Sequence, residues 1–313
     1  MNETPATFPS GDITLAGTLV TPEGNGPFPT ALLIAGSGPL DRDANHKRIA
    51  LNLSRDLASI LAAVGWASLR FDKRGVGASG GEYLSTGFFD ELDDATAAYR
   101  WMGEQRQVGT MVAVGHSAGA LQTVELASRE PSLAGGVLLA TSAKTGEETL
   151  RWQTQKLQDN IVPAPVKALL RLFNTSVVKQ QAKTIKRLQS TTTDTTRIQF
   201  VKINAKWMRE FIAYDPVPAL QKVRAPLLAI TGSKDTQVDP QDLLAVAEIT
   251  PDSTTTRIIE DVDHLLRSEP AEFSNPRKYR KQIKKSIDKR VTAALLEWLR
   301  MVDDDEPSVA PHW

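Results

Sequence analysis

Short apolar runs alternate with longer segments of helical periodicity through most of this 313-residue chain. Alternation of this kind is typical of a parallel sheet whose crossover helices cover both faces. It predicts an α/β protein with a mostly parallel central sheet. We expect an antiparallel edge strand at residues 12–22 and core strands at 29–35, 67–71, 110–114, 136–140, 226–231 and 255–260. Helices are expected at 46–64 (closed by Gly65), 88–105, 120–128 and 281–302, followed by a frayed acidic tail that begins at Asp303.

Residues 144–215 interrupt this alternation. They carry mostly helical patterns, two nearby prolines and a Thr-rich polar patch at 190–196, but no convincing core strand. The segment holds 13 Lys and Arg against 6 Asp and Glu, although the whole chain has 37 of each and no net charge. We therefore expect a core made of residues 1–143 and 216–313, into which 144–215 is inserted as a basic helical cap.

The composition excludes several classes of function. The chain contains no cysteine, so disulfides, thiolate nucleophiles and cysteine-bound metals are ruled out. A neutral chain has no overall field that draws it onto nucleic acid, and the basic residues of the cap are spaced as on a solvated helix face. No apolar run approaches the roughly 18 residues of a membrane span, and the first eleven residues lack the basic start of a signal peptide. We predict a cytoplasmic protein without nucleic-acid partner or membrane span, of undetermined oligomeric state.

The pattern Gly115-x-Ser117-x-Gly119 stands between an expected strand and an expected helix. On such a turn the serine, preceded here by His116, takes a tight backbone conformation, and the two glycines let neighbouring chain approach without clashes. Its hydroxyl is then exposed at the carboxyl edge of the sheet, beside the positive end of a helix. The pattern predicts a nucleophile elbow with Ser117 as the nucleophile; the alternative is a tight turn whose serine only caps the helix.

A serine nucleophile needs an adjacent base, usually a histidine that a carboxylate orients. The chain offers four histidines. His46 opens an expected helix, His312 lies in the tail, and His116 is inside the elbow, where it cannot easily reach back to the serine. His264 remains, on the loop after the strand 255–260, at the same edge of the sheet as the elbow. We predict that His264 is the general base.

The position of Asp235 predicts that it is the orienting acid. It follows the strand 226–231 in Gly232-Ser233-Lys234-Asp235, which gives the chain order serine, aspartate, histidine expected of a doubly wound sheet. Three other acids compete with it. Asp261 and Asp263 are too close in sequence to turn easily toward Nδ1 of the base, and Asp239 precedes a proline, a position that suits a helix cap.

A tetrahedral intermediate also needs two backbone N–H groups at its oxyanion. The first is expected from Ala118, the residue after the nucleophile. The second is expected from the loop Gly36-Ser37-Gly38-Pro39, after the strand 29–35. There Ser37 is the first choice and Gly38 the second, because Pro39 has no N–H.

Together these residues resemble the α/β-hydrolase superfamily outside the cap. More narrowly, they are similar to a bacterial carboxylesterase group close to the serine-aminopeptidase-like hydrolases. The resemblance implies hydrolysis of short acyl esters through an acyl-enzyme, without cofactor or metal. Many relatives carry His-Gly where this chain has Ala35-Gly36. Salt bridges are expected to hold loops through five charged residues: Asp41, Arg42, Asp43, Asp72 and Arg74. Besides the elbow, the motifs that carry the likeness are Gly36-Ser37-Gly38-Pro39-x-Asp41-Arg42-Asp43, Asp72-Lys73-Arg74-Gly75-x-Gly77, Gly232-Ser233-Lys234-Asp235 and Val262-Asp263-His264-Leu265-Leu266-Arg267.

We therefore predict a carboxylesterase-type serine hydrolase for small-molecule esters of short to medium acyl chains. An aminopeptidase or acyl-peptide hydrolase needs a carboxylate for the substrate amine or an extra recognition domain, and the cap is basic. A thioesterase would use the same triad, and a ligand-binding receptor on this fold is the non-enzymatic alternative. Seven apolar cap residues are expected to pack on the core or line the pocket: Trp152, Leu169, Leu170, Phe173, Trp207, Met208 and Phe211.

Overall fold

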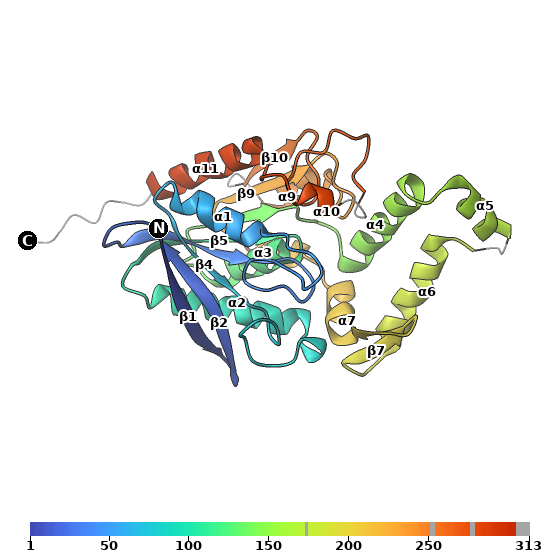
Figure 1. Ribbon diagram of the computed structural model, residues 1–313, viewed down its shortest axis with the longest axis horizontal. Helices are drawn as coiled ribbons and strands as arrows, with labels where there is room; N and C mark the ends of the chain where they lie inside the picture. Colours follow the sequence, from blue (N-terminus) through green and yellow to red (C-terminus); the bar gives the residue numbers. More distant parts are fainter. Residues whose placement is uncertain (173–174, 251–253, 276–278, 305–313) are drawn as a thin grey trace, which may run out of the picture.

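The structure is a computed structural model that describes residues 1–172, 175–250, 254–275 and 279–304. Its centre is an eight-stranded sheet in the order β1-β2-β4-β3-β5-β6-β9-β10 (Figure 1). Neighbouring strands from β4 to β10 run parallel, whereas β2 is antiparallel to both β1 and β4. The prediction of a mostly parallel α/β sheet is confirmed. The strands are β1 (Asn2–Ser10), β2 (Ile13–Thr21), β3 (Phe28–Ile34), β4 (Ala67–Phe71), β5 (Val108–His116), β6 (Gly135–Leu139), β9 (Leu227–Gly232) and β10 (Thr254–Ile259).

Helices cover both faces of the sheet, because successive side chains of a buried strand point to opposite sides. Leu32 of β3 belongs to one apolar cluster and its neighbour Leu33 to the other. The cluster of Leu32 includes residues of α2 (Phe88–Gly103), α3 (Ala118–Arg129), α8 (Val217–Leu220) and α9 (Asp242–Ile249). The cluster of Leu33 includes residues of α1 (Leu53–Ala62) and α11 (Lys289–Asp304). Two short helices, η1 (Tyr83–Ser85) and α10 (Tyr279–Gln282), lie in connections.

The segment expected as a cap projects from one side of the sheet (Figure 1). It begins with a capping box, in which Thr145 and Glu148 each accept the backbone N–H of the other. Its two strands pair only with each other, so no described strand of the segment joins the central sheet. Among the described residues, no helix has both the length and the apolar character that a membrane crossing requires. The elements are α4 (Gly146–Asn160), α5 (Ala164–Leu172), α6 (Val177–Ser190), β7 (Thr195–Ile198), β8 (Val201–Asn204) and α7 (Ala205–Ala213).

At the N-terminus the prediction of an edge strand at 12–22 is wrong in one respect. Strand β2 lies there and is antiparallel, but β1 pairs along its outer side and is the edge strand itself. The second half of β1 alternates buried and exposed residues, with Ala6 and Phe8 in the core. Pro5 and Pro9 fit this place because an edge strand leaves half of its backbone groups outside the ladder.

The first helix begins at Leu53, not at residue 46 as predicted. The preceding residues form a loop, in which Asp41 accepts two backbone N–H groups and Asn52 has a left-handed φ of 52°. The predicted end is confirmed: Gly65 has φ 88°, and Trp66 donates its backbone N–H to the carbonyl of Leu61.

The last helix is also shorter than predicted. α11 begins at Lys289, where the Asp288 carboxylate accepts the backbone N–H of Arg290, whereas residue 281 belongs to the separate helix α10. The acidic tail does not begin at Asp303 as predicted, because Asp303 and Asp304 form the end of α11. Residues 305–313 lie outside the described residues, and His312 lies among them. Phe173 and the side chain of Leu169, two of the expected apolar cap residues, also lie outside the description.

Candidate active site

Ser117 lies at the junction of β5 and α3, where the chain turns from the sheet edge into the helix. Its backbone has φ 55° and ψ −120°, a conformation that a residue with a side chain rarely adopts. Hydrogen bonds hold it there, because Ser117 donates its N–H to the carbonyl of Leu139 at 2.8 Å and accepts the N–H of Ala120 at 2.9 Å. The turn therefore fixes the serine at the start of a helix, where backbone N–H groups have no helical partner.

The flanking glycines are required by space. A Cβ atom on Gly115 would overlap the carbonyl oxygen of Gly119, and one on Gly119 would overlap the carbonyl oxygen of Ile34. Any side chain at either position would therefore push β5 and α3 apart or displace β3. The pattern therefore needs glycine at both positions because the backbones approach each other so closely there.

Asp235 and His264 are brought together at the carboxyl edge of the sheet, 29 residues apart in sequence. Oδ2 of Asp235 lies 2.8 Å from Nδ1 of His264, and both side chains are buried. The other oxygen, Oδ1, accepts the backbone N–H groups of Gln237 and Val238 at 2.7 and 3.0 Å. A carboxylate can only accept, so Nδ1 carries the proton. In the neutral ring, Nε2 then has a free lone pair and can act as a base.

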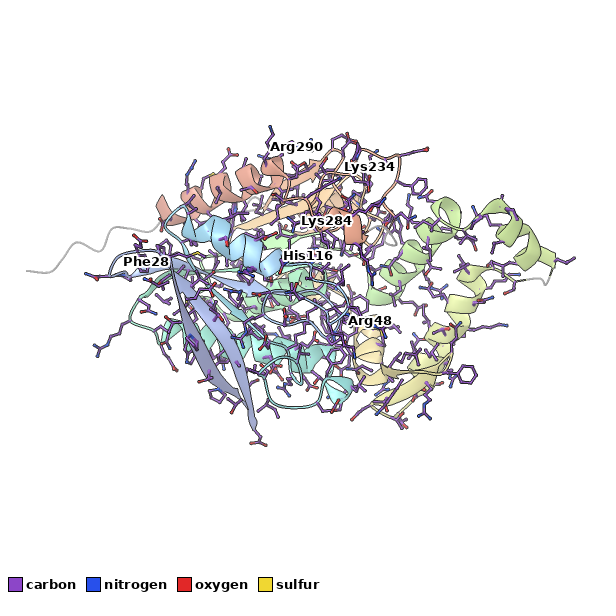
Figure 2. The ribbon with its side chains drawn as sticks, viewed as in Figure 1. Phe28, Arg48, His116, Lys234, Lys284 and Arg290 are labelled. Carbon is purple, nitrogen blue, oxygen red and sulfur yellow. The ribbon has the colours of Figure 1, made fainter. Side chains whose placement is uncertain are left out.

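His116 connects this pair to the elbow. Its Nε2 lies 2.8 Å from the carbonyl oxygen of His264, and the two ring centroids are 4.9 Å apart. Because a carbonyl only accepts, Nε2 of His116 is the donor. Burial, together with the neighbouring His264, lowers the pKa of His116 to about 3, so the ring is neutral. Figure 2 labels His116, whose side chain is buried. Sequence reasoning missed this link, which joins residues 148 positions apart.

The competing acids form other bonds. Asp239 accepts from Nζ of Lys144 at 3.1 Å and from the backbone of Gln241. Asp261 pairs with Lys234 at 3.4 Å and is half exposed. Asp263 is fully buried, and burial raises its pKa to about 6, but Oδ1 accepts the backbone N–H groups of Leu265 and Arg267. Each of these three carboxylates thus has another partner.

Of the remaining histidines, His46 lies in a loop instead of opening a helix as predicted, and its Nδ1 accepts the backbone N–H of Arg48. The helix starts later because the loop between Asp41 and Asn52 has its own hydrogen bonds, including one from Asn45 to the Asn52 side chain. The backbone of His46 also pairs with Ile49 in the same loop, and His312 lies outside the described residues.

A cavity of about 140 Å³ opens at the serine. The core contributes Ser37 and Ala118, the two expected oxyanion donors, whereas Gly38 is not among the described residues that line it. Gly36 brings the Ser37 loop close to the elbow, since a Cβ on it would lie 3.2 Å from Cβ of Ser117. The complete lining is Ser37, Ser117, Ala118, Leu121, Ser142, Thr149, Leu150, Gln153, Trp207, Met208, Phe211, Gln237 and Val238.

One wall of the cavity is held by a buried carboxylate that sequence reasoning missed. Oε2 of Glu91 accepts from Nζ of Lys73 at 2.9 Å, from Gln122 at 3.1 Å and from the indole N–H of Trp207 at 3.0 Å. Trp207 in turn stacks on Phe211 with centroids 4.9 Å apart. The local sequence does not single out Glu91, because a carboxylate in the first turn of a helix is favoured by the helix end alone.

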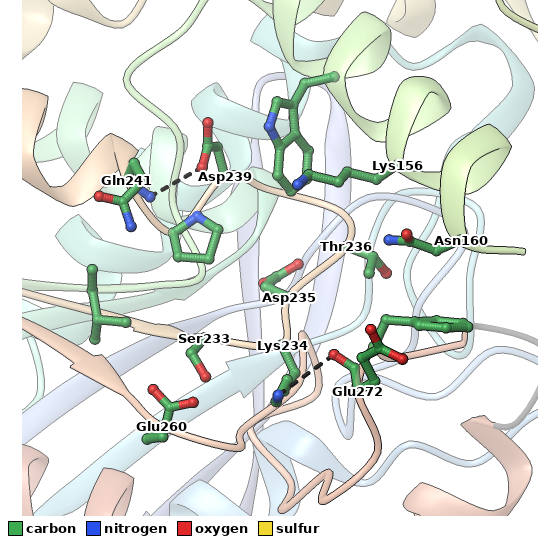
Figure 3. A pocket seen from close by; sticks show the side chains of 14 residues that line it. Lys156, Asn160, Ser233, Lys234, Asp235, Thr236, Asp239, Gln241, Glu260 and Glu272 are labelled. Carbon is green, nitrogen blue, oxygen red and sulfur yellow. Dashed lines mark hydrogen bonds between the residues drawn. The ribbon is translucent and has the colours of Figure 1, made fainter.

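A separate polar hollow of about 380 Å³ lies beside Asp235 (Figure 3). Lys234 and Glu260 belong to its rim, and Lys156 of α4 faces it from the segment 144–215. The Asp235 side chain is nevertheless buried, because its oxygens are covered by the bonds to His264 and to the following backbone. Within the described part of the chain, no three His, Asp or Glu side chains gather as a metal site would require.

The predicted salt bridges that hold loops are confirmed, with one exception. Arg42 binds Asp72 with Nη2 to Oδ2 at 2.6 Å, and Asp72 also accepts the backbone N–H of Ala78. Burial by itself would raise the pKa of Asp72, but the hydrogen bonds from Arg42 and the backbone hold it below the usual value. Arg74 pairs with Asp94, and Asp43 pairs with Arg70. Asp41 instead accepts the backbone N–H groups of Asp43 and Asn45 in its loop.

Solved structures share this fold at low sequence identity. Est1E from Butyrivibrio proteoclasticus, solved with ferulic acid bound, is 17% identical with a TM-score of 0.66, and the match covers 96% of this chain and 100% of that one. A proline iminopeptidase from Mycobacterium smegmatis is 15% identical with a TM-score of 0.64, covering 96% and 99%. At these identities the likeness establishes the fold alone.

The sheet, its helices and the serine turn define an α/β hydrolase, as predicted. A family model described as serine aminopeptidase, S33, matches residues 51–271, which is more than half of the chain. The chain belongs to this hydrolase family. It is also 29% identical over 302 residues to a protein named esterase EstD from Thermotoga maritima, a match that covers 94% of this chain and 68% of the relative.

Proposed function

We propose that this protein is a carboxylesterase-type serine hydrolase that cleaves esters of short to medium acyl chains through an acyl-enzyme on Ser117. Membership of the hydrolase family and the likeness to an esterase over most of the chain support ester hydrolysis. The observation that carries the assignment of roles is the 2.8 Å hydrogen bond between Asp235 and His264, both buried, on loops that follow β9 and β10.

In the proposed mechanism, Oγ of Ser117 attacks the ester carbonyl while Nε2 of His264 takes its proton. Asp235 keeps the proton on Nδ1 and stabilises the imidazolium. The N–H groups of Ala118 and Ser37 hold the oxyanion. His264 then returns the proton to the leaving alcohol, which departs and leaves the acyl group on the serine. Water, activated by His264, attacks this acyl-enzyme, and the carboxylic acid leaves as Ser117 recovers its proton.

We further propose that residues 144–215 act as a cap over this site. Support comes from the lining of the 140 Å³ cavity: Leu150 and Gln153 of α4 and Trp207, Met208 and Phe211 of α7 all face it from that segment. The cap is therefore expected to select substrates, while the core supplies the reacting groups. The substrate partner is a small-molecule ester, and the cytoplasmic location inferred from the sequence stays a prediction.

Peptide hydrolysis at a free N-terminus is the weaker candidate. Such an enzyme needs a carboxylate that holds the substrate amine, and the described residues that line the cavity include no Asp or Glu. Thioesters would use the same groups as esters. Turnover of p-nitrophenyl butyrate, butyryl-CoA and alanine p-nitroanilide compares ester, thioester and peptide-type hydrolysis. We expect the oxygen ester to be hydrolysed fastest.

A fluorophosphonate probe tests whether the serine is the nucleophile. It should label Ser117 once per chain, as seen by mass spectrometry of the modified peptide, and His264→Ala should slow the labelling. An unlabelled protein would favour a ligand-binding receptor on this fold over an enzyme.

A further inference from the structure

Two glutamines line both the cavity at Ser117 and a second cavity of about 360 Å³. Gln153 lies on α4, and Gln237 lies on the loop after β9. Nε2 of Gln153 donates to Oε1 of Gln237 at 3.5 Å, and Nε2 of Gln237 donates to the Tyr279 hydroxyl at 2.8 Å. The amide pair therefore stands as a partition between the two cavities.

The second cavity suits an alkyl chain. Leu157 and Ile161 line it from the end of α4, and Tyr279 faces them from α10. Thr154 and Thr236 complete the described lining together with the two glutamines, and none of these residues is charged. A cavity with such walls excludes charged groups and favours a hydrocarbon, because apolar surface is removed from water on binding.

The volume of the first cavity limits what it holds by itself. Its 140 Å³ is close to the roughly 150 Å³ of a cavity that holds one benzene ring, so about six carbon atoms fill it. An ester chain that is longer has to continue elsewhere. The second cavity is the neighbouring space that shares a wall with the first.

The partition is built to open. Its amide–amide contact is at the outer limit of hydrogen-bond length and joins two neutral groups, so little is lost when it breaks. The backbone of Gln237 is fixed, because its N–H binds Oδ1 of Asp235 at 2.7 Å. Rotation of the Gln153 side chain away from Gln237, whose bond to Tyr279 stays in place, therefore opens the passage without moving the acid that orients His264.

We propose that the second cavity is a chain subsite, which takes the part of an unbranched alkyl chain beyond about its sixth carbon, and that Gln153 and Gln237 part to admit it. The inference rests on the proposed ester hydrolysis and names its substrate class: esters with one alkyl chain of about eight to twelve carbons, a length that exceeds the first cavity and reaches into the second.

Leu157→Trp, which fills the chain subsite, is the test, and Gln155→Trp on the exposed side of α4 is the matched control. The measured quantity is the ratio of kcat/KM for a long ester to that for a short one. An acyl arm compares p-nitrophenyl decanoate with butyrate, and an alcohol arm compares decyl acetate with butyl acetate. We expect Leu157→Trp to lower the ratio at least tenfold in one arm, which identifies the chain that enters the subsite, and Gln155→Trp to leave both ratios within twofold.

A ratio that Leu157→Trp leaves unchanged in both arms overturns the chain subsite, while wild-type hydrolysis of butyrate keeps the proposed function standing. If circular dichroism shows that this variant does not fold, the double variant Gln153→Ala, Gln237→Ala decides. Opening the partition should raise the long-to-short ratio severalfold, and an unchanged ratio overturns the inference. A wild-type protein that hydrolyses no ester would remove the proposed function, and the chain subsite with it.

Discussion

The ring of His116 donates a hydrogen bond from Nε2 to the backbone carbonyl oxygen of His264 at 2.8 Å. The residue before the proposed nucleophile is thereby tied to the proposed base, although they come from β5 and from the loop after β10. The side chain of His264 is fixed at Nδ1 by Asp235, and its backbone is fixed by His116. Two independent bonds therefore set where the lone pair of Nε2 lies.

Removing the hydrogen bond that His116 donates should let the backbone and ring of His264 shift from their position. We expect His116→Phe to lower kcat for p-nitrophenyl butyrate by about tenfold to a hundredfold with little change in KM, because misplacement by about 1 Å at a reacting group costs up to that much. His116→Gln keeps an N–H donor and should recover most of the loss. Equal losses in both variants would argue that ring packing matters and the hydrogen bond does not.

Stability should depend on pH through the same residue. The pKa of His116 is lowered to about 3 in the folded protein, whereas an unfolded histidine titrates near 6.5. Between these values the unfolded state binds more protons, so the free energy of unfolding falls as the pH falls. Asp263 acts in the opposite direction below pH 6, because burial raises its pKa to about 6 and the folded state then takes up the proton first.

His116→Gln isolates the histidine from this background. From pH 6.5 to pH 5.5, the wild type should lose about 1 kcal/mol more unfolding free energy than His116→Gln, measured by urea titration at constant ionic strength. Parallel pH profiles for the two proteins would show that His116 is protonated equally easily in the folded and unfolded states.

The acid can be identified by a matched pair of variants. Asp235→Asn should lower kcat by about a thousandfold or more, because an amide no longer selects the Nδ1–H tautomer. Asp239→Asn removes the competing acid that pairs with Lys144, and it should keep kcat within about threefold, as a loss remote from the reacting groups does. A larger loss in Asp239→Asn than in Asp235→Asn would reverse the assignment.

Glu91→Gln should destabilise the protein by about 3 kcal/mol or more, since it leaves the buried ammonium of Lys73 without its countercharge. The control is Glu130→Gln, which breaks a pair with the largely exposed Arg100 and should cost less than about 1 kcal/mol. Urea unfolding gives both values. Similar losses would mean that the Lys73–Glu91 pair is no more than a surface-type contact.

The elbow, the proposed acid and the proposed base could be placed at one edge of the sheet from the sequence, because each follows within a few residues of a predicted strand. Parallel strands end at one edge of a sheet, so Ser117, Asp235 and His264 share that edge once the order of strands is granted. The helix end at Gly65 could be predicted in the same way, because a left-handed glycine after an apolar helix depends only on the local sequence.

The errors have physical causes. β1 was missed because its two prolines oppose a strand, and only pairing with β2 on one side makes them tolerable. The start of α1 was placed too early because Asp41 and Asn45 hold the preceding residues in a loop that competes with helix formation. The contacts of His116 with His264 and of Gln153 with Gln237 form only in the folded chain, so no local sequence pattern predicts them.

Ser117 is proposed as the nucleophile of an ester hydrolase. The most direct test of this role is kcat/KM for p-nitrophenyl butyrate in the wild type and in Ser117→Ala, with circular dichroism as the check on folding. We expect the variant to fold as the wild type does and to lose about a thousandfold to a millionfold of the activity. A folded Ser117→Ala protein that hydrolyses the ester at a rate close to that of the wild type would contradict the account.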